Sequence, residues 1–278
     1  MSYESRRMKE RPRLVEPSMS EGARRQGELW SQAASDWADL QEDRALPAIR
    51  RALELIQLRS GDRVLDVGCG AGGAMLEASK AGVVIDGIDA APALIAIARQ
   101  RLPSASFHVA DMMALPYKDE TFDVVTGFFA LPYAIDPVGA LRQARRVAKS
   151  AARFALVAWG REEECQAAIH FRALRALLAP APPGSPTPLA ADQRLPHFLQ
   201  AAGLKVSHDE SVSCPWNYPD VAVALRALRS AGPVRRVLEI LGDDVVDAAL
   251  RDSLAPFTNE DGEVRLENRF RVLIATKE

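Results

Sequence analysis

The sequence predicts an α/β fold with a doubly wound, mostly parallel seven-stranded sheet of the Rossmann-like type and an antiparallel last strand. From residue 63 onward, short apolar runs alternate with stretches of helical periodicity, which is typical of right-handed βαβ units. The runs at 83–85 (VVI) and 154–158 (FALVA) lack alternating polar residues, as expected of parallel strands buried on both faces. The last predicted strand follows without a further crossover helix, so we expect it to be antiparallel.

The N-terminal part is predicted to be a tail followed by two helices. Residues 1–20 mix charged residues, Pro and Ser without apolar periodicity, and we expect a flexible tail. Apolar residues, including Trp30 and Trp37, recur at three- and four-residue spacing over 22–40, which predicts a helix. A second helix follows Pro47, because proline is favourable at a first helical position, and ends at about residue 58.

Strands and helices then alternate through the rest of the chain. We expect strands at 63–67, 83–89, 106–110, 122–127 and 153–159, with helices at 74–81, 92–101 and 137–149. Helices at 162–178 and 191–202 flank a proline-rich loop at 179–188, and a strand at 204–212 precedes helical residues 219–256 and a strand at 264–276. Residues 21–278 are therefore interpreted as one domain with helical insertions at about 160–200 and 213–258.

Composition argues against several classes of function. The net charge of −2 gives no general attraction to nucleic acid or to anionic membranes. No apolar run approaches the roughly 18 residues of a spanning helix, and the N-terminus lacks the apolar core of a signal peptide, so we expect a cytoplasmic protein. The three cysteines and four histidines are scattered without metal-ligand spacing, and no metal site is expected.

A glycine-rich turn after the strand at 63–67 organises the candidate site. Gly68, Gly70 and Gly73 match the dinucleotide G-x-G-x-x-G spacing, and Asp89 follows about 20 residues later. Glycine tolerates the backbone angles of such a turn, and we expect free amides at the start of the next helix to favour an electron-rich ligand group. Asp66 argues against a dinucleotide, because a carboxylate at this strand end would repel a pyrophosphate and would suit an ammonium group.

Four ordered motifs resemble those of the class I S-adenosylmethionine-dependent methyltransferases, in their ubiquinone-methyltransferase-like (type 11) branch. They lie at 64–72 (VLDVGCGAG), 87–89 (GID), 110–112 (ADM) and 115–125 (LPYKDETFDVV). The resemblance covers residues 22–160 motif by motif and rests on element order beyond them. The turn at 149–153 (KSAAR) departs from the Pro-Gly-Gly usual in the family, which puts the local turn geometry in question.

The resemblance implies S-adenosylmethionine as the methyl donor and S-adenosylhomocysteine as the product. Asp66 and the glycine loop would hold the methionine end of the donor. Asp89 would accept from both ribose hydroxyls, because a carboxylate has two acceptor oxygens for a vicinal diol, and Asp111 would accept from the adenine amino group. Trp37 and Trp30 would form part of a lid built from helices at about 22–58, although core packing is equally open for both. The implied cofactor-binding residues are Asp66, Gly68, Cys69, Gly70, Gly72, Asp89, Ala90, Asp111, Met112, Phe128 and Trp37.

The acceptor is expected beyond the carboxyl ends of the strands, where doubly wound sheets bind ligands. We expect a small, partly hydrophobic acceptor from secondary or specialised metabolism, methylated on O, C or N. The candidate walls of its site are Phe128, Phe129, Tyr133, Trp159, Phe171, His197, Trp216 and Tyr218, and the candidate catalytic residues are His170, His197 and Tyr133.

Two alternative functions stay open at this level. A non-catalytic cofactor-binding protein of the same fold would share every motif, and an NAD(P)-dependent reductase would share the glycine loop. Nucleic-acid substrates are disfavoured, because residues 130–133 (ALPY) lack the Asn/Asp-Pro-Pro-aromatic motif of enzymes that methylate DNA amino groups. The helical residues 219–256 could serve as a lid or as the interface of a homodimer.

Overall fold

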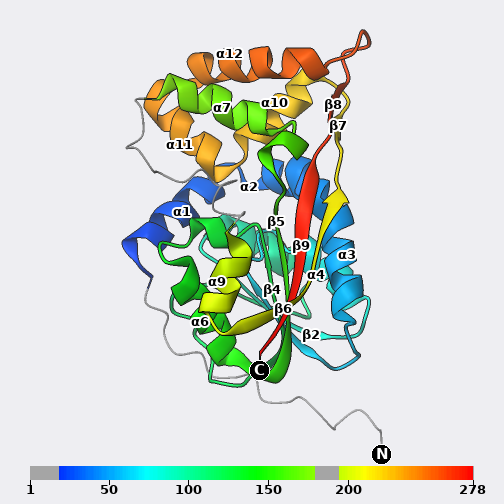
Figure 1. The fold of residues 1–278 in the computed structure, drawn as a ribbon. Helices are drawn as coiled ribbons and strands as arrows, with labels where there is room; N and C mark the ends of the chain where they lie inside the picture. Colours follow the sequence, from blue (N-terminus) through cyan, green and yellow to red (C-terminus); the bar gives the residue numbers. More distant parts are fainter. Residues whose placement is uncertain (1–18, 179–193, 278) are drawn as a thin grey trace, which may run out of the picture.

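A seven-stranded sheet lies at the centre of this computed structural model, which describes residues 19–178 and 194–277 (Figure 1). The strand order is β3-β2-β1-β4-β5-β9-β6. Neighbouring strands from β3 to β5 are parallel, whereas β9 runs antiparallel to both β5 and β6, so the predicted fold class is confirmed. The strands are β1 (Arg63–Val67), β2 (Val84–Asp89), β3 (Ser106–Val109), β4 (Phe122–Phe128), β5 (Ala148–Trp159), β6 (Leu204–Ser213) and β9 (Arg269–Lys277).

Helices cover both faces of this sheet and form two hydrophobic cores. One core holds residues of α3 (Leu46–Ile56), α4 (Gly73–Ser79) and α5 (Pro92–Arg101), and the other holds residues of α6 (Pro137–Val147) and α9 (Leu195–Ala201). Along β1, Val64 belongs to the first core and Leu65 to the second, and β4 alternates in the same way. Each strand is buried on both faces, which explains the continuous apolar runs in the sequence.

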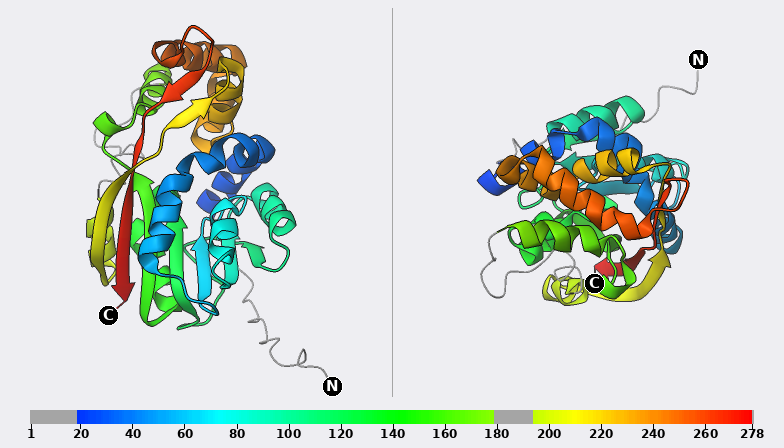
Figure 2. Two further views of the ribbon diagram at one scale, coloured as in Figure 1. Left: turned by 90° about the vertical axis from the view of Figure 1, so that its right-hand side faces the viewer. Right: turned by 90° about the horizontal axis from the view of Figure 1, so that it is seen from above.

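A second group of elements forms a lid above the carboxyl ends of the parallel strands (Figure 2). Its helices are α7 (Ala168–Leu177), α10 (Val221–Arg229), α11 (Gly232–Leu241) and α12 (Asp243–Leu254), and its two-stranded sheet pairs β7 (Trp216–Tyr218) with β8 (Val264–Leu266). The predicted helical stretch at 219–256 therefore contributes to the lid. No helix in the two described ranges is long and apolar enough to cross a membrane.

The predicted substrate-side insertion at 160–200 divides between two places. Helix α7 belongs to the lid, but α9 packs beside α6 on the sheet, where Leu195 and Leu199 are buried in the second core. A helical pattern shows that a segment has an apolar face, but not which surface receives that face. The predicted tail, apart from its last two residues, and the proline-rich loop at 179–188 lie outside the described residues.

The predicted helix at 22–40 is divided into shorter pieces. It consists of α1 (Glu21–Ser31), α2 (Ala34–Asp36) and a π-helical turn, Trp37–Gln41, and a 3-10 turn, Glu42–Ala45, follows it. The π-helical turn buries Gln41, whose side-chain oxygen accepts a 2.7 Å hydrogen bond from the Tyr218 hydroxyl. Turns of this kind are frequent at functional sites, and here the turn ties the N-terminal segment to the lid.

The predicted strand at 264–276 is interrupted between β8 and β9. Asn268 is buried there, and its side-chain oxygen accepts a 3.0 Å hydrogen bond from the Ala167 amide. Its backbone carbonyl accepts a 2.7 Å hydrogen bond from the Cys214 amide. These bonds hold the chain at a break between the two strands. On one side of the break β8 pairs with β7 in the lid, and on the other β9 pairs within the main sheet.

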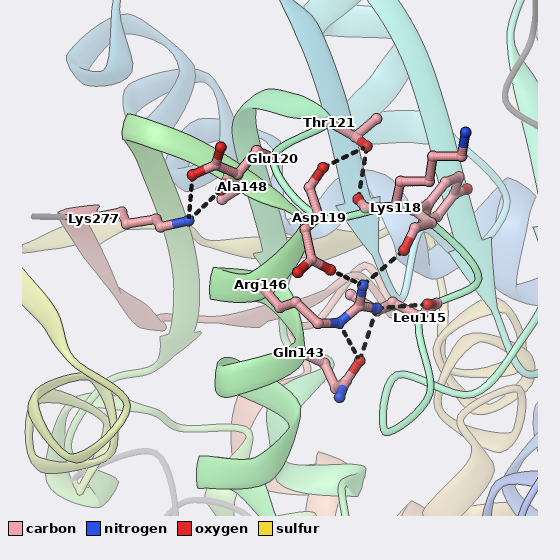
Figure 3. A network of polar contacts seen from close by, with 10 residues as sticks. Leu115, Lys118, Asp119, Glu120, Thr121, Gln143, Arg146, Ala148 and Lys277 are labelled. Atoms are coloured by element: carbon pink, nitrogen blue, oxygen red, sulfur yellow. Dashed lines mark hydrogen bonds and ion pairs between the residues drawn. The ribbon is translucent and has the colours of Figure 1, made fainter.

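Arg146 on α6 fixes the connection between β3 and β4 (Figure 3). Its guanidinium donates to the carbonyl oxygens of Leu115 and Tyr117, both at 2.8 Å, and pairs with Asp119 at 2.7 Å.

The turn that lacks Pro-Gly-Gly lies within the start of β5. Strand β5 already begins at Ala148, and Ala151 adopts a left-handed φ of 58°, a conformation that glycine adopts with less strain.

Candidate functional site

Three aspartates meet at the carboxyl ends of three neighbouring strands. Asp66 lies on β1, Asp89 ends β2, and Asp111 follows β3. All three line one cavity of about 430 Å³ that extends from the sheet into the lid. Every residue of the predicted cofactor-binding set lines this cavity except Gly72. The parallel strand order thus brings Asp66 and Asp111, which are 45 residues apart in the sequence, to one wall of the cavity.

The glycine loop lets the backbone lie directly against the cavity. Gly68 has a φ of 79°, and a Cβ atom there would lie 2.3 Å from the Cβ atom of Ala130. Gly70 also has a positive φ, of 54°. Gly72 lies behind the loop, where a Cβ atom would lie 3.2 Å from that of Ala98, so its role is to let α4 and α5 approach.

The amides of the glycine loop already have partners within the protein. The Gly70 amide donates to Asp89 Oδ2 at 3.0 Å, and the Ala71 amide donates to Glu42 Oε1 at 2.9 Å. The amides of Gly68 and Cys69 donate to the Ile88 carbonyl. These loop amides are therefore paired with the protein's own carboxylates and a carbonyl, whereas the expectation of free amides concerned the start of the next helix, α4.

Glu42 is a site residue that the sequence analysis missed. It reaches the loop from the 3-10 turn, and its second oxygen accepts from Arg101 at 2.5 Å. Burial raises the pKa of the Glu42 carboxyl, while the charge and hydrogen bond of Arg101 oppose that rise. No local pattern marks Glu42, because its partner amide lies 29 residues further along the chain.

Asp66 is the most deeply buried of the site carboxylates, with 1% of its surface exposed. Its Oδ1 accepts a 2.7 Å hydrogen bond from the Thr126 hydroxyl on β4. Burial raises the pKa of Asp66 to about 7 against the opposing effect of that hydrogen bond, and the charges of Asp89 and Glu42 add to the rise. A cation bound beside Asp66 would relieve this repulsion and favour the ionised carboxylate.

Asp89 and Asp111 each accept hydrogen bonds from backbone amides. Asp89 Oδ1 accepts from the Ala91 amide at 2.8 Å, and Asp111 Oδ1 accepts from the Met113 amide at 2.8 Å. Asp111 Oδ2 also accepts from the Ser20 hydroxyl at 2.6 Å and from the Ser20 amide at 3.1 Å. Ser20 is the N-cap of α1, so the first helix begins on the wall of the cavity.

The N-terminal helices close the cavity over the glycine loop. Trp30 and Trp37 lie edge to face with their ring centroids 4.7 Å apart. The Trp37 indole nitrogen lies 3.7 Å from the position that a Cβ atom of Gly70 would occupy. A Cβ atom at Gly232 of α11 would lie 2.5 Å from the Trp30 indole nitrogen, so this glycine allows the lid to rest on the tryptophan.

Aromatic rings form the other part of the cavity wall. Trp159 lies edge to face with Phe129 at 5.9 Å, with Phe171 at 5.4 Å and with Trp216 at 5.7 Å between ring centroids. Of the remaining predicted wall residues, Phe128 and Tyr133 line the cavity, whereas Tyr218 does not. This end of the cavity is suited to flat apolar groups.

The three candidate catalytic residues are found in different places. His170 and Tyr133 line the cavity, and burial lowers the pKa of His170 to about 4, so its imidazole is neutral at neutral pH. The structure places His197 on the exposed side of α9, outside the cavity lining. This position corrects its assignment to the substrate wall, because α9 belongs to the sheet and not to the lid.

Comparison with known proteins agrees with this geometry. Residues 65–156, which include the glycine loop and the strands around it, match the family model described as a methyltransferase domain. Residues 65–156 therefore form a methyltransferase domain. Its lid lies beyond the matched residues.

Curated relatives of the methyltransferase domain match over part of their length. The 27-O-demethylrifamycin SV methyltransferase of Amycolatopsis mediterranei is 36% identical over 113 residues, which is 38% of this chain and 42% of that protein. The demethylmenaquinone methyltransferase of Streptomyces griseus is 34% identical over 105 residues, or 37% of this chain and 46% of that protein. The matches thus span less than half the length of these relatives.

Solved structures share the fold over most of the chain. The YcgJ protein of Bacillus subtilis aligns with a TM-score of 0.57 at 21% identity, covering 83% of this chain and 98% of that one. The [4+2]-cyclase SpnF aligns with a TM-score of 0.53 at 22% identity, covering 82% of this chain and 79% of that one. At these identities the likeness concerns the fold alone.

Proposed function

We propose that this protein transfers a methyl group from S-adenosylmethionine to a small, largely apolar acceptor bound beneath the lid. The observation that carries the proposal is one continuous cavity with carboxylates at its sheet end and aromatic rings at its lid end. The methyltransferase domain and its named relatives support the reaction class.

The residues present fit the methyl donor better than a dinucleotide. Asp66, Asp89 and Glu42 surround the glycine loop, and a pyrophosphate would face repulsion from all three carboxylates. An ammonium group beside Asp66 and a ribose diol beside Asp89 would instead complete their hydrogen bonding. Among the described residues that line the cavity, Arg44 carries the one guanidinium and offers a partner for the donor's carboxylate.

The chain itself contributes positioning and the exclusion of water. S-adenosylmethionine supplies an electrophilic methyl group on a sulfonium, and displacement at that methyl requires an aligned nucleophile. The lid and the tryptophans of the N-terminal helices cover part of the cavity, which would limit the access of water to the reacting atoms. The neutral His170 has a lone pair that could receive a proton from an O–H or N–H acceptor, and the Tyr133 hydroxyl could hydrogen-bond to that acceptor.

We infer that the acceptor is a small molecule of secondary or specialised metabolism, and not nucleic acid, and that the protein works in the cytoplasm. The mostly apolar lining of the cavity supports a small acceptor, since a nucleic acid would need a basic surface. The relative named 27-O-demethylrifamycin SV methyltransferase supports the metabolic setting.

Calorimetry with S-adenosylhomocysteine and with NADH tests the proposal. We expect binding of S-adenosylhomocysteine, no binding of NADH, and a roughly 10- to 100-fold loss of affinity in Asp89→Ala, which removes hydrogen bonds to a charged acceptor. Asp261→Asn, a change to an exposed turn carboxylate, serves as the control and should bind as the parent does.

Binding of NADH alone, or unchanged affinity in Asp89→Ala, would contradict the proposed donor. An acceptor panel of phenols, indoles, amines and activated methylenes, read by the mass of one added methyl group, then tests turnover. Tight cofactor binding with no product across the panel would favour a non-catalytic role for the same fold.

A further inference from the structure

Two residues that line the lid end of the cavity each have a buried polar atom without a hydrogen-bond partner. These atoms are His170 Nε2 on α7 and Trp216 Nε1 on β7, and their residues are 3% and 5% exposed. Both residues line the same cavity. Buried polar groups in folded proteins are nearly always paired, so two unpaired atoms in one apolar compartment indicate a ligand that pairs them.

The hydrogen bonds around His170 determine whether its Nε2 atom is a hydrogen-bond donor or an acceptor. The Ser253 hydroxyl donates to the Leu250 carbonyl at 2.7 Å, and its oxygen lies 2.7 Å from His170 Nδ1. A hydroxyl has one hydrogen, so Nδ1 must be the donor in its contact with Ser253. His170 is neutral because burial lowers its pKa to about 4. Its Nε2 therefore carries a lone pair and accepts a hydrogen bond.

Trp216 provides the complementary group. The indole nitrogen is a donor and has no acceptor capacity. Trp159 contacts the Trp216 ring at 5.7 Å and also contacts Phe171, the neighbour of His170, at 5.4 Å between centroids. One donor and one acceptor thus lie in a single aromatic-walled compartment. No described lid residue that lines the cavity is a Lys, Arg, Asp or Glu, so the compartment is suited to a neutral group.

We propose that the lid end of the cavity binds a hydroxyl group on a ring-containing, neutral acceptor. The hydroxyl donates its hydrogen to His170 Nε2, and its oxygen accepts from Trp216 Nε1, while the aromatic walls contact the ring. His170 and Trp216 are substrate-binding residues, and Ser253 is a positioning residue that holds the imidazole. This inference rests on the proposed function, because it describes the acceptor of that reaction.

Three matched probes test the inference in the presence of saturating S-adenosylhomocysteine. Naphthol can donate and accept a hydrogen bond, methoxynaphthalene can only accept one, and naphthalene can do neither. We expect naphthol to bind the parent protein roughly 5- to 10-fold more tightly than methoxynaphthalene, as one additional buried hydrogen bond predicts. Calorimetry measures all three affinities.

Substitutions assign the preference to the two residues. In His170→Leu the preference for naphthol over methoxynaphthalene should disappear. In Trp216→Phe, which keeps an aromatic ring, both oxygen-bearing probes should weaken while naphthalene does not. His197→Leu is the matched histidine control, because this residue is exposed on α9, and all its affinities should equal those of the parent.

The outcomes separate this inference from the proposed function. Failure of the parent protein to bind S-adenosylhomocysteine would count against the proposed function. Normal cofactor binding with no measurable binding of naphthol, or with equal affinity for naphthol and methoxynaphthalene, would overturn the inference alone. Should His170→Leu lose cofactor binding through misfolding, Trp216→Phe decides, and unchanged naphthol affinity in that variant would also overturn the inference.

Discussion

Asp66 should make the empty protein less stable as the pH rises. Burial raises the pKa of this carboxyl to about 7 from the model-compound value of 3.8. The folded protein therefore keeps a proton on Asp66 over a pH range in which the unfolded chain has released it. Stability from this group is complete below about pH 4 and is lost progressively as the pH rises through about 7.

The size of the effect follows from the separation of the two pKa values. It corresponds to a loss of up to ~4 kcal/mol in the free energy of unfolding between about pH 4 and pH 8. Asp66→Asn, which retains the size of the side chain and an acceptor for Thr126, should remove most of this loss. We expect the variant to be more stable than the parent at about pH 8 and of similar stability at about pH 4.

Urea unfolding of the cofactor-free protein at several pH values measures this difference. Asp261→Asn controls for the loss of a carboxylate at an exposed position. In parallel, the affinity of the parent for S-adenosylhomocysteine should rise about tenfold between about pH 6 and pH 8, as Asp66 ionises opposite the ligand's ammonium group. A parent whose stability follows that of the Asn variant at every pH would refute the reasoning.

Two further predictions concern the segments that hold the site. A Cβ atom at Gly27 of α1 would lie 2.1 Å from the Ala90 carbonyl oxygen, so Gly27→Ala should destabilise the protein by about 1–3 kcal/mol in urea unfolding. Gly22→Ala in the same helix meets no atom within 4 Å and should stabilise it by about 0.5–1 kcal/mol, and equal effects of the two changes would contradict this packing. Arg101→Leu leaves the Glu42 carboxylate without its guanidinium partner and should cost about 3–5 kcal/mol, whereas the double variant with Glu42→Gln should recover part of that loss. Additive effects of these two substitutions would show that the ion pair contributes nothing.

Local sequence patterns predicted several strands and helices of the fold correctly. The strands at 63–67 and 122–127 and the helix at 92–101 agree with β1, β4 and α5 to within one residue, because periodicity and flanking Gly or Pro are local properties. The order of the three aspartates along the chain also predicted their meeting, since parallel strands bring their carboxyl ends to one edge.

Errors arose where the prediction depended on which part of the fold a segment packs against. The pattern at 191–202 predicted a helix correctly over its described part, yet His197 was placed on the substrate wall because the sequence did not show that α9 joins the sheet. The single strand predicted at 264–276 is broken by Asn268, whose partner Ala167 lies 101 residues earlier. Glu42 was missed because nothing near the loop predicts it as the partner of the Ala71 amide.

The sequence by itself determined the fold class and the succession of strands and helices along the chain, and its resemblance to a family implied the carboxylates of the site. The fold class and this succession follow from spacing within short segments and from the geometry of parallel sheets. Only the tertiary structure decided what occupies the loop amides, which helices form the lid and which imidazole nitrogen of His170 has no partner. Those features depend on pairs such as Glu42 with Ala71, Gln41 with Tyr218 and His170 with Ser253, which are 29, 177 and 83 residues apart. No local pattern encodes such pairs, because they exist only after the helices have packed.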